Sequence, residues 1–83
     1  QKSVRERVAL SLLLLRDKFK KENQDSPVEV DLSREDLAKF VGTARETLVR
    51  LLHDFKEEGL IETNGRKIIL KKPVELSKIA NIF

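Results

Sequence analysis

Cysteine is absent from the sequence, and histidine occurs once, as His53. Without thiols, neither a disulfide framework nor a thiolate metal site can form. A single imidazole likewise excludes a zinc site built from several histidines. The 83 residues are enough for one small domain, which apolar packing alone must stabilise.

Long apolar runs are also missing. The longest, residues 12–15, is far shorter than the roughly 20 residues of a membrane-spanning helix. The N-terminus is charged and lacks the small-residue cleavage site of a signal peptide. Because the sequence also begins without Met, we expect a fragment of a longer, cytoplasmic protein.

Charge is unevenly distributed along the chain, whose net charge is +3. Residues 1–22 carry seven basic and three acidic side chains, and residues 43–72 carry seven and five. Residues 23–42 carry two basic and five acidic side chains. The basic segments could face a polyanion, whereas the acidic middle as a whole could not.

The first part of the chain predicts a helix over about residues 3–21. Ser3 and Glu6 have the spacing of a capping box. One apolar face recurs at helical spacing and comprises Val8, Leu12, Leu15 and Phe19. The polar residues 21–27, which end at Pro27, then indicate a loop, and Val28 and Val30 alternate with charged residues as in a short strand.

Two helices joined by a tight turn are predicted over about residues 33–58. Ser33 begins the first of them, and Gly42 ends it. Its expected buried side comprises Leu37, Ala38, Phe40 and Val41. Thr43 and Glu46 predict a second capping box. The inner face of the helix that follows comprises Leu48, Leu51, Leu52 and Phe55.

A β-hairpin is predicted over about residues 60–72, because Asn64-Gly65 is a strong signal for a type I′ turn. Pro73 ends the return strand, and a short helix is predicted over about residues 74–82. Two helices joined by a turn and followed by a hairpin predict a mainly α domain with a small β wing, a winged helix-turn-helix. An ordinary αα-hairpin is the alternative for the two helices.

The outer face of the helix predicted at 44–58 carries Arg45, Glu46, Val49 and Arg50. In a recognition helix, such residues meet base edges in the major groove, where Arg suits guanine and Glu suits cytosine. A solvated face with Glu46 and Arg50 as an ion pair is the alternative.

Residues 37–52 resemble the helix-turn-helix signature of the Crp/Fnr family of bacterial transcription regulators, and residues 55–61 and 64–68 resemble its helix end and wing. The specific part is Gly-x-x-Arg-Glu-Thr-x-x-Arg, which begins at Gly42, with Gly-Leu-Ile downstream. The resemblance extends from Val4 to about Ala80. It implies a DNA-binding domain rather than an enzyme.

By this resemblance, Arg45, Glu46 and Arg50 match base-reading positions. Val49 departs from the small or hydroxylated residue common there, and either contacts a thymine methyl or makes no base contact. The positions that contact phosphates in the family correspond here to the Val4 amide, Ser33, Thr43, Thr47 and Arg66. Helix capping by Ser33 and Thr43, and a solvated Arg66, are the alternatives. Ala44 stands where a hydroxyl residue is common, which removes one phosphate contact.

The resemblance also implies parts that this chain lacks. An N-terminal sensor domain would bind an effector, for which the family uses cyclic nucleotides among others, and no cofactor is expected in this chain. A homodimer would bind an approximately palindromic site in double-stranded DNA. The loop at 22–29 corresponds to a region that touches RNA polymerase in some relatives, a solvated connector being the alternative. No membrane contact is expected, and His53 is expected to be solvated at the edge of the DNA-binding face.

Two other classes of function compete with DNA binding. A winged-helix module that binds only proteins typically lacks outer-face arginines and a basic wing, whereas this chain has both. An enzyme would need clustered carboxylates, a nucleophile–base pair or a glycine-rich phosphate loop, and the sequence contains none of these.

Overall fold

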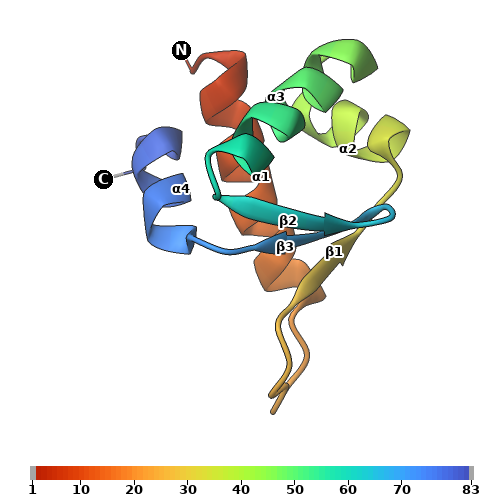
Figure 1. The fold of residues 1–83 in the computed structure, drawn as a ribbon, viewed down its shortest axis with the longest axis vertical. Helices are drawn as coiled ribbons and strands as arrows, with labels where there is room; N and C mark the ends of the chain where they lie inside the picture. Colours follow the sequence, from red (N-terminus) through yellow and green to blue (C-terminus); the bar gives the residue numbers. More distant parts are fainter. Residues whose placement is uncertain (1, 83) are drawn as a thin grey trace.

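The computed structural model describes residues 2–82. Within them the elements are α1 (Val4–Phe19), β1 (Glu29–Asp31), α2 (Arg34–Val41), α3 (Arg45–Glu57), β2 (Ile61–Asn64), β3 (Lys67–Leu70) and α4 (Pro73–Ala80). In Figure 1, α1 runs through the centre, with α2 and α3 on one side of it and α4 on the other. The predicted fold class, mainly α with a small β wing, is confirmed.

Helix α1 begins with the predicted capping box. The Ser3 hydroxyl accepts a hydrogen bond from the Glu6 amide at 3.1 Å, and the Glu6 carboxylate accepts one from the Ser3 amide at 2.8 Å. These bonds satisfy two amides that lack partners within the helix. The helix ends at Phe19 rather than near residue 21, because Lys20 adopts an extended conformation.

The turn between α2 and α3 differs from its prediction. Gly42 adopts the left-handed conformation with φ of 83°, and the amides of Gly42 and Thr43 both donate to the Ala38 carbonyl, at 2.9 and 3.0 Å. Thr43 therefore completes the end of α2, and Ala44 becomes the N-cap of α3 without a side-chain bond. The predicted capping box of Thr43 and Glu46 is wrong, because α3 begins one residue later than that box requires.

The buried side of α2 is narrower than predicted. Leu37, Ala38 and Val41 are buried, but the Phe40 residue is 48% exposed, so its expected burial is wrong. With only eight residues, α2 contacts the core through one stripe, and Phe40 lies to one side of it.

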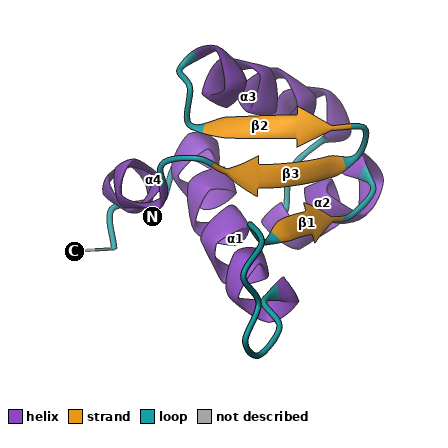
Figure 2. Ribbon diagram, turned by 60° about the horizontal axis from the view of Figure 1, so that its bottom comes forward, coloured by secondary structure: helices purple, strands orange, loops and turns teal. Residues whose placement is uncertain are grey.

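The three strands form one antiparallel sheet in the order β1-β3-β2, shown in Figure 2. In the hairpin, Asn64 pairs with Lys67, so the two residues of the turn are Gly65 and Arg66. Gly65 has a φ of 61°, and Arg66 is not among the residues with positive φ. A positive φ at the first central residue alone fits a type II′ turn, so the predicted type I′ turn centred on Asn64-Gly65 is wrong.

The apolar core lies between the sheet and the helices behind it in Figure 2. Four residues of α3 fill it from one side, as predicted: Leu48, Leu51, Leu52 and Phe55 are buried. Leu76 and Ala80 bury α4 against α1. Because the inner side of α3 is fully used in this packing, its opposite side is free to face solvent.

Candidate nucleic-acid interface

One side of α3 gathers the residues that the sequence predicts to contact bases. Arg45, Glu46, Val49 and Arg50 are all exposed and line the same shallow depression. Val49 is 44% exposed, which leaves an apolar surface between charged neighbours. Among residues 2–82, no ion pair joins Glu46 to Arg50, so the side chains on this face are available for an external partner.

The placement of α3 depends on a clamp made by Arg7. Its guanidinium donates to the carbonyls of Val41 at 3.4 Å, Gly42 at 3.2 Å and Lys2 at 3.2 Å. A cation at the C-terminal end of a helix also interacts favourably with the helix dipole, here that of α2. Arg7 therefore fixes the turn before α3 against the beginning of α1.

The predicted phosphate contacts lie on four parts of the fold: the beginning of α1, the beginning of α2, the turn with the first turn of α3, and the wing. Val4 is the first residue of α1, where backbone amides lack intrahelical partners. Ser33 caps α2 by accepting from the Asp36 amide at 3.0 Å. Thr43 lies in the turn, Thr47 lies in the first turn of α3, and both are partly exposed. The fifth residue, Arg66, lies at the tip of the wing.

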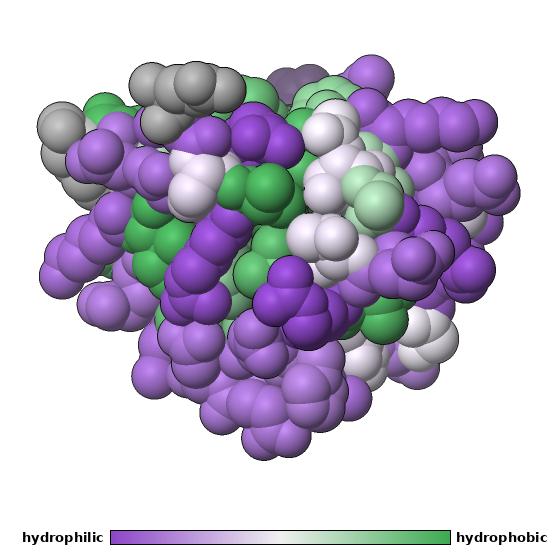
Figure 3. Space-filling model, turned by 90° about the horizontal axis from the view of Figure 1, so that it is seen from above, coloured by the Kyte–Doolittle hydropathy of each residue, from purple (hydrophilic) through white to green (hydrophobic). Residues whose placement is uncertain are grey.

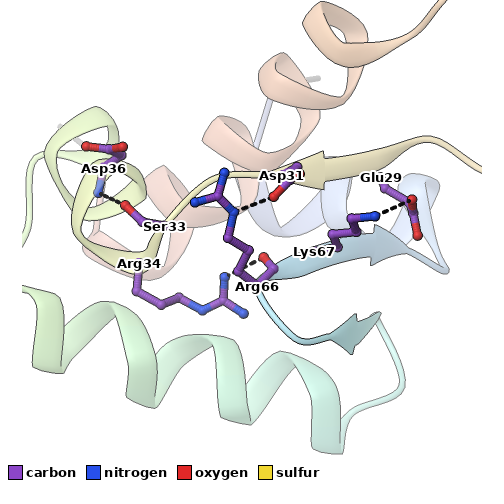
Figure 4. Close-up of polar contacts among 7 residues, drawn as sticks. All are labelled: Glu29, Asp31, Ser33, Arg34, Asp36, Arg66 and Lys67. Carbon is purple, nitrogen blue, oxygen red and sulfur yellow. Dashed lines mark hydrogen bonds and ion pairs between the residues drawn. The ribbon is translucent and has the colours of Figure 1, made fainter.

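The wing is occupied by internal ion pairs, two of which Figure 4 shows. The Arg66 Nε donates to the Asp31 carboxylate on β1, and Lys67 Nζ lies 3.7 Å from a carboxylate oxygen of Glu29. On the other side of the hairpin, Lys71 Nζ lies 3.3 Å from Glu62. Three of the wing's basic residues therefore have acidic partners within the domain.

Arg34 is a residue of this surface that the sequence analysis missed. Its Nη1 donates to the Arg66 carbonyl at 2.9 Å and so ties the beginning of α2 to the tip of the wing, as Figure 4 shows. Partial burial lowers the pKa of the Arg34 guanidinium below its ordinary value. Its position directly after a capping serine was the available signal, but its partner lies 32 residues further along the chain.

A second shallow hollow lies between α3 and the wing and joins the two parts of this surface. It is lined by Arg34, Val49, Leu52, His53, Lys56 and Thr63. His53 is exposed there, with its Nε2 3.5 Å from the Glu57 carboxylate. Figure 3 views the molecule from the top of Figure 1 and shows a mostly hydrophilic surface with hydrophobic side chains set among the polar ones.

The profile of the family described as the Crp-like helix-turn-helix domain matches residues 6–79. The chain belongs to this family. A CRP-like cAMP-activated global transcriptional regulator from Mycobacterium tuberculosis is 35% identical over 75 residues, which are 89% of this chain and 34% of that protein. The global nitrogen regulator of a Nostoc species is 37% identical over 51 residues, which are 61% of this chain and 23% of that protein.

Solved structures of the Crp-like type have the same fold. A CRP/FNR-family transcriptional regulator from Thermus thermophilus superposes with a TM-score of 0.85 at 27% identity, covering 96% of this chain and 41% of that one. The catabolite activator protein of Thermus thermophilus superposes with a TM-score of 0.79 at 29% identity, covering 94% and 34%. The chain is thus a DNA-binding helix-turn-helix domain of transcription regulators, and it spans about a third of the length of such relatives.

Two further observations concern residues 2–82 alone. None of their helices has the length and apolar character that crossing a bilayer requires. Within the same range, no three acidic or histidine side chains gather where they could hold a metal ion.

Proposed function

We propose that this domain recognises a specific sequence of double-stranded DNA, with α3 in the major groove, as part of a bacterial Crp/Fnr-type transcription regulator. The observation that supports this most is the exposed side of α3, where two arginines, a glutamate and a valine share one depression. A recognition helix needs such a side opposite its buried one, near its N-terminus.

Each side chain of that depression suits a particular base edge. Arg45 and Arg50 can each donate two hydrogen bonds to O6 and N7 of a guanine. Glu46 can accept from N4 of a cytosine, and Val49 can contact the methyl group of a thymine. We therefore expect at least one G·C pair in each half-site.

The surrounding groups would hold the DNA backbone. The proposed phosphate contacts are the Val4 amide, Ser33, Thr43, Thr47 and Arg66. Contacts of this kind fix the register of a protein on the duplex without selecting its sequence. The Arg7 clamp then sets the distance between the α1 contact and the base-reading helix.

The rest of the regulator is proposed from its relatives, since this chain spans only about a third of their length. We propose an N-terminal sensor domain that binds a small effector. A cyclic nucleotide is our first choice, because the name of the Mycobacterium tuberculosis relative describes it as cAMP-activated. Two such proteins would form a homodimer on an approximately palindromic site with half-sites about one helical turn apart. RNA polymerase is a further proposed partner, at the loop of residues 22–29.

An amide-resolved NMR titration of the domain with a short palindromic duplex at low salt tests the proposal. Shifts should cluster at Val4, at Ser33, over residues 43–50 and in the wing at residues 64–67. If shifts were absent, or were confined to the loop at residues 22–29, DNA binding would be wrong for this domain. A winged-helix module that binds another protein would then be the better hypothesis.

A further inference from the structure

The tip of the wing and β1 carry opposite charges that form two ion pairs. Strand β1 lies antiparallel to β3 and brings Asp31 directly opposite Lys67, next to the tip of the hairpin. The Asp31 carboxylate accepts a hydrogen bond from Arg66 Nε, so the proposed phosphate contact already has an anionic partner. Glu29 holds Lys67 in a similar but longer contact of 3.7 Å.

The tip of the wing cannot easily move away from this partner. Arg34 donates to the Arg66 carbonyl at 2.9 Å, which fixes the backbone of the turn, and Gly65 closes that turn with a positive φ. The Arg66 side chain can therefore choose between the Asp31 carboxylate and a phosphate, while its backbone stays in place.

We propose that Asp31 is a positioning residue that competes with DNA phosphate for Arg66 and so limits what the wing contributes to DNA binding. This inference rests on the proposed function. The pair is open to solvent, with side-chain exposures of 59% for Arg66 and 39% for Asp31, so a phosphate can reach the guanidinium. Such exposed pairs are weak enough to be exchanged for another partner.

The competition has a specific electrostatic consequence. When a cation of the protein neutralises a phosphate, a counterion is released from the DNA. Each such contact makes the logarithm of the DNA-binding constant fall more steeply with the logarithm of the salt concentration, by about 0.9 in slope. Arg66 and Asp31 together form a neutral pair, so the approach of this pair to DNA releases few counterions. The wild-type domain should therefore have a salt slope that lacks most of the contribution of Arg66.

The test uses the palindromic duplex that gives the largest shifts in the NMR titration, called the selected site below. Its binding is measured as a function of salt concentration, with fluorescence anisotropy as the readout. Asp31→Asn should steepen the slope by about 0.9 and tighten binding by about twofold to fivefold at low salt. Asp31→Glu should restore nearly the wild-type slope, because the charge is kept. Glu75→Gln is the matched control: it changes the net charge equally but frees Lys78 on α4, at the opposite side of the molecule from the wing tip in Figure 1.

A double-mutant cycle then shows whether Asp31 acts through Arg66. In the Arg66→Ala background, Asp31→Asn should leave the slope unchanged, because no guanidinium remains to be freed. Urea unfolding of each variant confirms that it is folded before binding is compared, and Asp31→Ala serves as a second variant should Asp31→Asn be unstable.

Three results would overturn the inference: an unchanged slope in Asp31→Asn, an equal change in Glu75→Gln, or a change that persists without Arg66. All three require a wild-type domain that binds the duplex. If the wild-type domain bound no duplex at all, the proposed function itself would be wrong.

Discussion

The outer side of α3 and the wing are both basic, yet their charges are differently placed. Within the described chain, Arg45 and Arg50 on α3 have no ion-pair partner, whereas Arg66 and Lys67 in the wing are each held by a carboxylate of β1. Counting charges along residues 43–72 treats the two regions as one basic segment. On the competition proposed above, the position of the nearest carboxylate, more than the number of cations, decides which region attracts DNA strongly.

The reason for the difference lies in the packing of the two regions. Helix α3 packs through its inner side, and among residues 2–82 no carboxylate forms an ion pair with Arg45 or Arg50 on its outer side. The wing lies beside β1, which belongs to the acidic middle of the sequence. The carboxylates of this acidic segment therefore offset part of the positive charge of the wing.

The largest effect on DNA binding should come from substitutions on the outer side of α3, where the arginines have no ion-pair partner within the part of the chain that the structure describes. Arg45→Ala or Arg50→Ala should each weaken binding to the selected site by about 1–3 kcal/mol and relax the choice of base at one position. Binding to a panel of duplexes with single base changes measures both effects. Lys18→Ala, on the distant end of α1, is the control and should change neither. Unaltered selectivity in Arg45→Ala would contradict direct base contact by this residue.

Substitution of two glycines tests the two regions separately, because Gly42 lies in the turn before α3 and Gly65 lies in the turn of the wing. Gly42 and Gly65 both have positive φ, and open space surrounds the position of an added Cβ at each. Alanine at either site should therefore lower the free energy of unfolding by about 1–2 kcal/mol, through backbone strain alone, measured by urea denaturation. Only Gly42→Ala should also reduce base selectivity, because Gly42 sets the direction of α3. Equal losses of selectivity in both variants would mean that the wing matters as much as α3.

A smaller effect is expected from a substitution in the wing, where the basic residues have acidic partners. Arg66→Ala should weaken binding by less than about 1 kcal/mol, equally for all duplexes, because the arginine already shares its charge with Asp31. The same duplex panel measures this. A loss comparable to that of Arg45→Ala, or one limited to certain sequences, would remove the contrast between the two regions.

The smallest effect concerns the capping box at the beginning of α1. Hydrogen bonds from the Ser3 amide and the Ser3 hydroxyl lower the pKa of Glu6 below its ordinary 4.5. Because the folded-state pKa is lowered, this stabilisation is present above about pH 4.5 and is lost as the pH falls through the folded-state value. Thermal unfolding between pH 6 and pH 3 should therefore show a slightly smaller decrease in Glu6→Gln than in the wild type. Identical decreases would show that the capping box contributes no pH dependence.

Local sequence patterns predicted the elements well, and their failures have local causes. The same Ser/Thr-x-x-Glu spacing forms a capping box at Ser3 and none at Thr43. The Ser3 amide donates to the Glu6 carboxylate, whereas the Thr43 amide already donates to the end of α2. When two helices are separated by so short a turn, one residue can belong to the end of the first or to the beginning of the second. A pattern that describes one helix at a time cannot decide between the two.

The features that sequence could not supply depend on contacts between distant residues. The short strand around Val30 was predicted, but its pairing with Ile68 on β3 was not. That pairing brings Asp31 to Arg66, which lies 35 residues further along the chain. The turn type has a similar cause, since the register between β2 and β3 places Asn64 in the ladder and moves Gly65 to the first turn position. The outer side of α3 could be predicted because it depends only on helical spacing.

The contact between the beginning of α1 and the end of α4 bears on circular permutation of the domain. Lys2 Nζ donates to the Ala80 carbonyl at 2.6 Å, although the two residues are 78 positions apart. Because a lysine side chain spans the gap between them, the two ends can be joined by a short linker, and new ends are best tolerated in an exposed polar loop. Residues 20–28 form such a loop, well away from α3 in Figure 1. A circular permutant opened there would begin at β1 and keep α3, the turn and the wing as one uninterrupted stretch of chain.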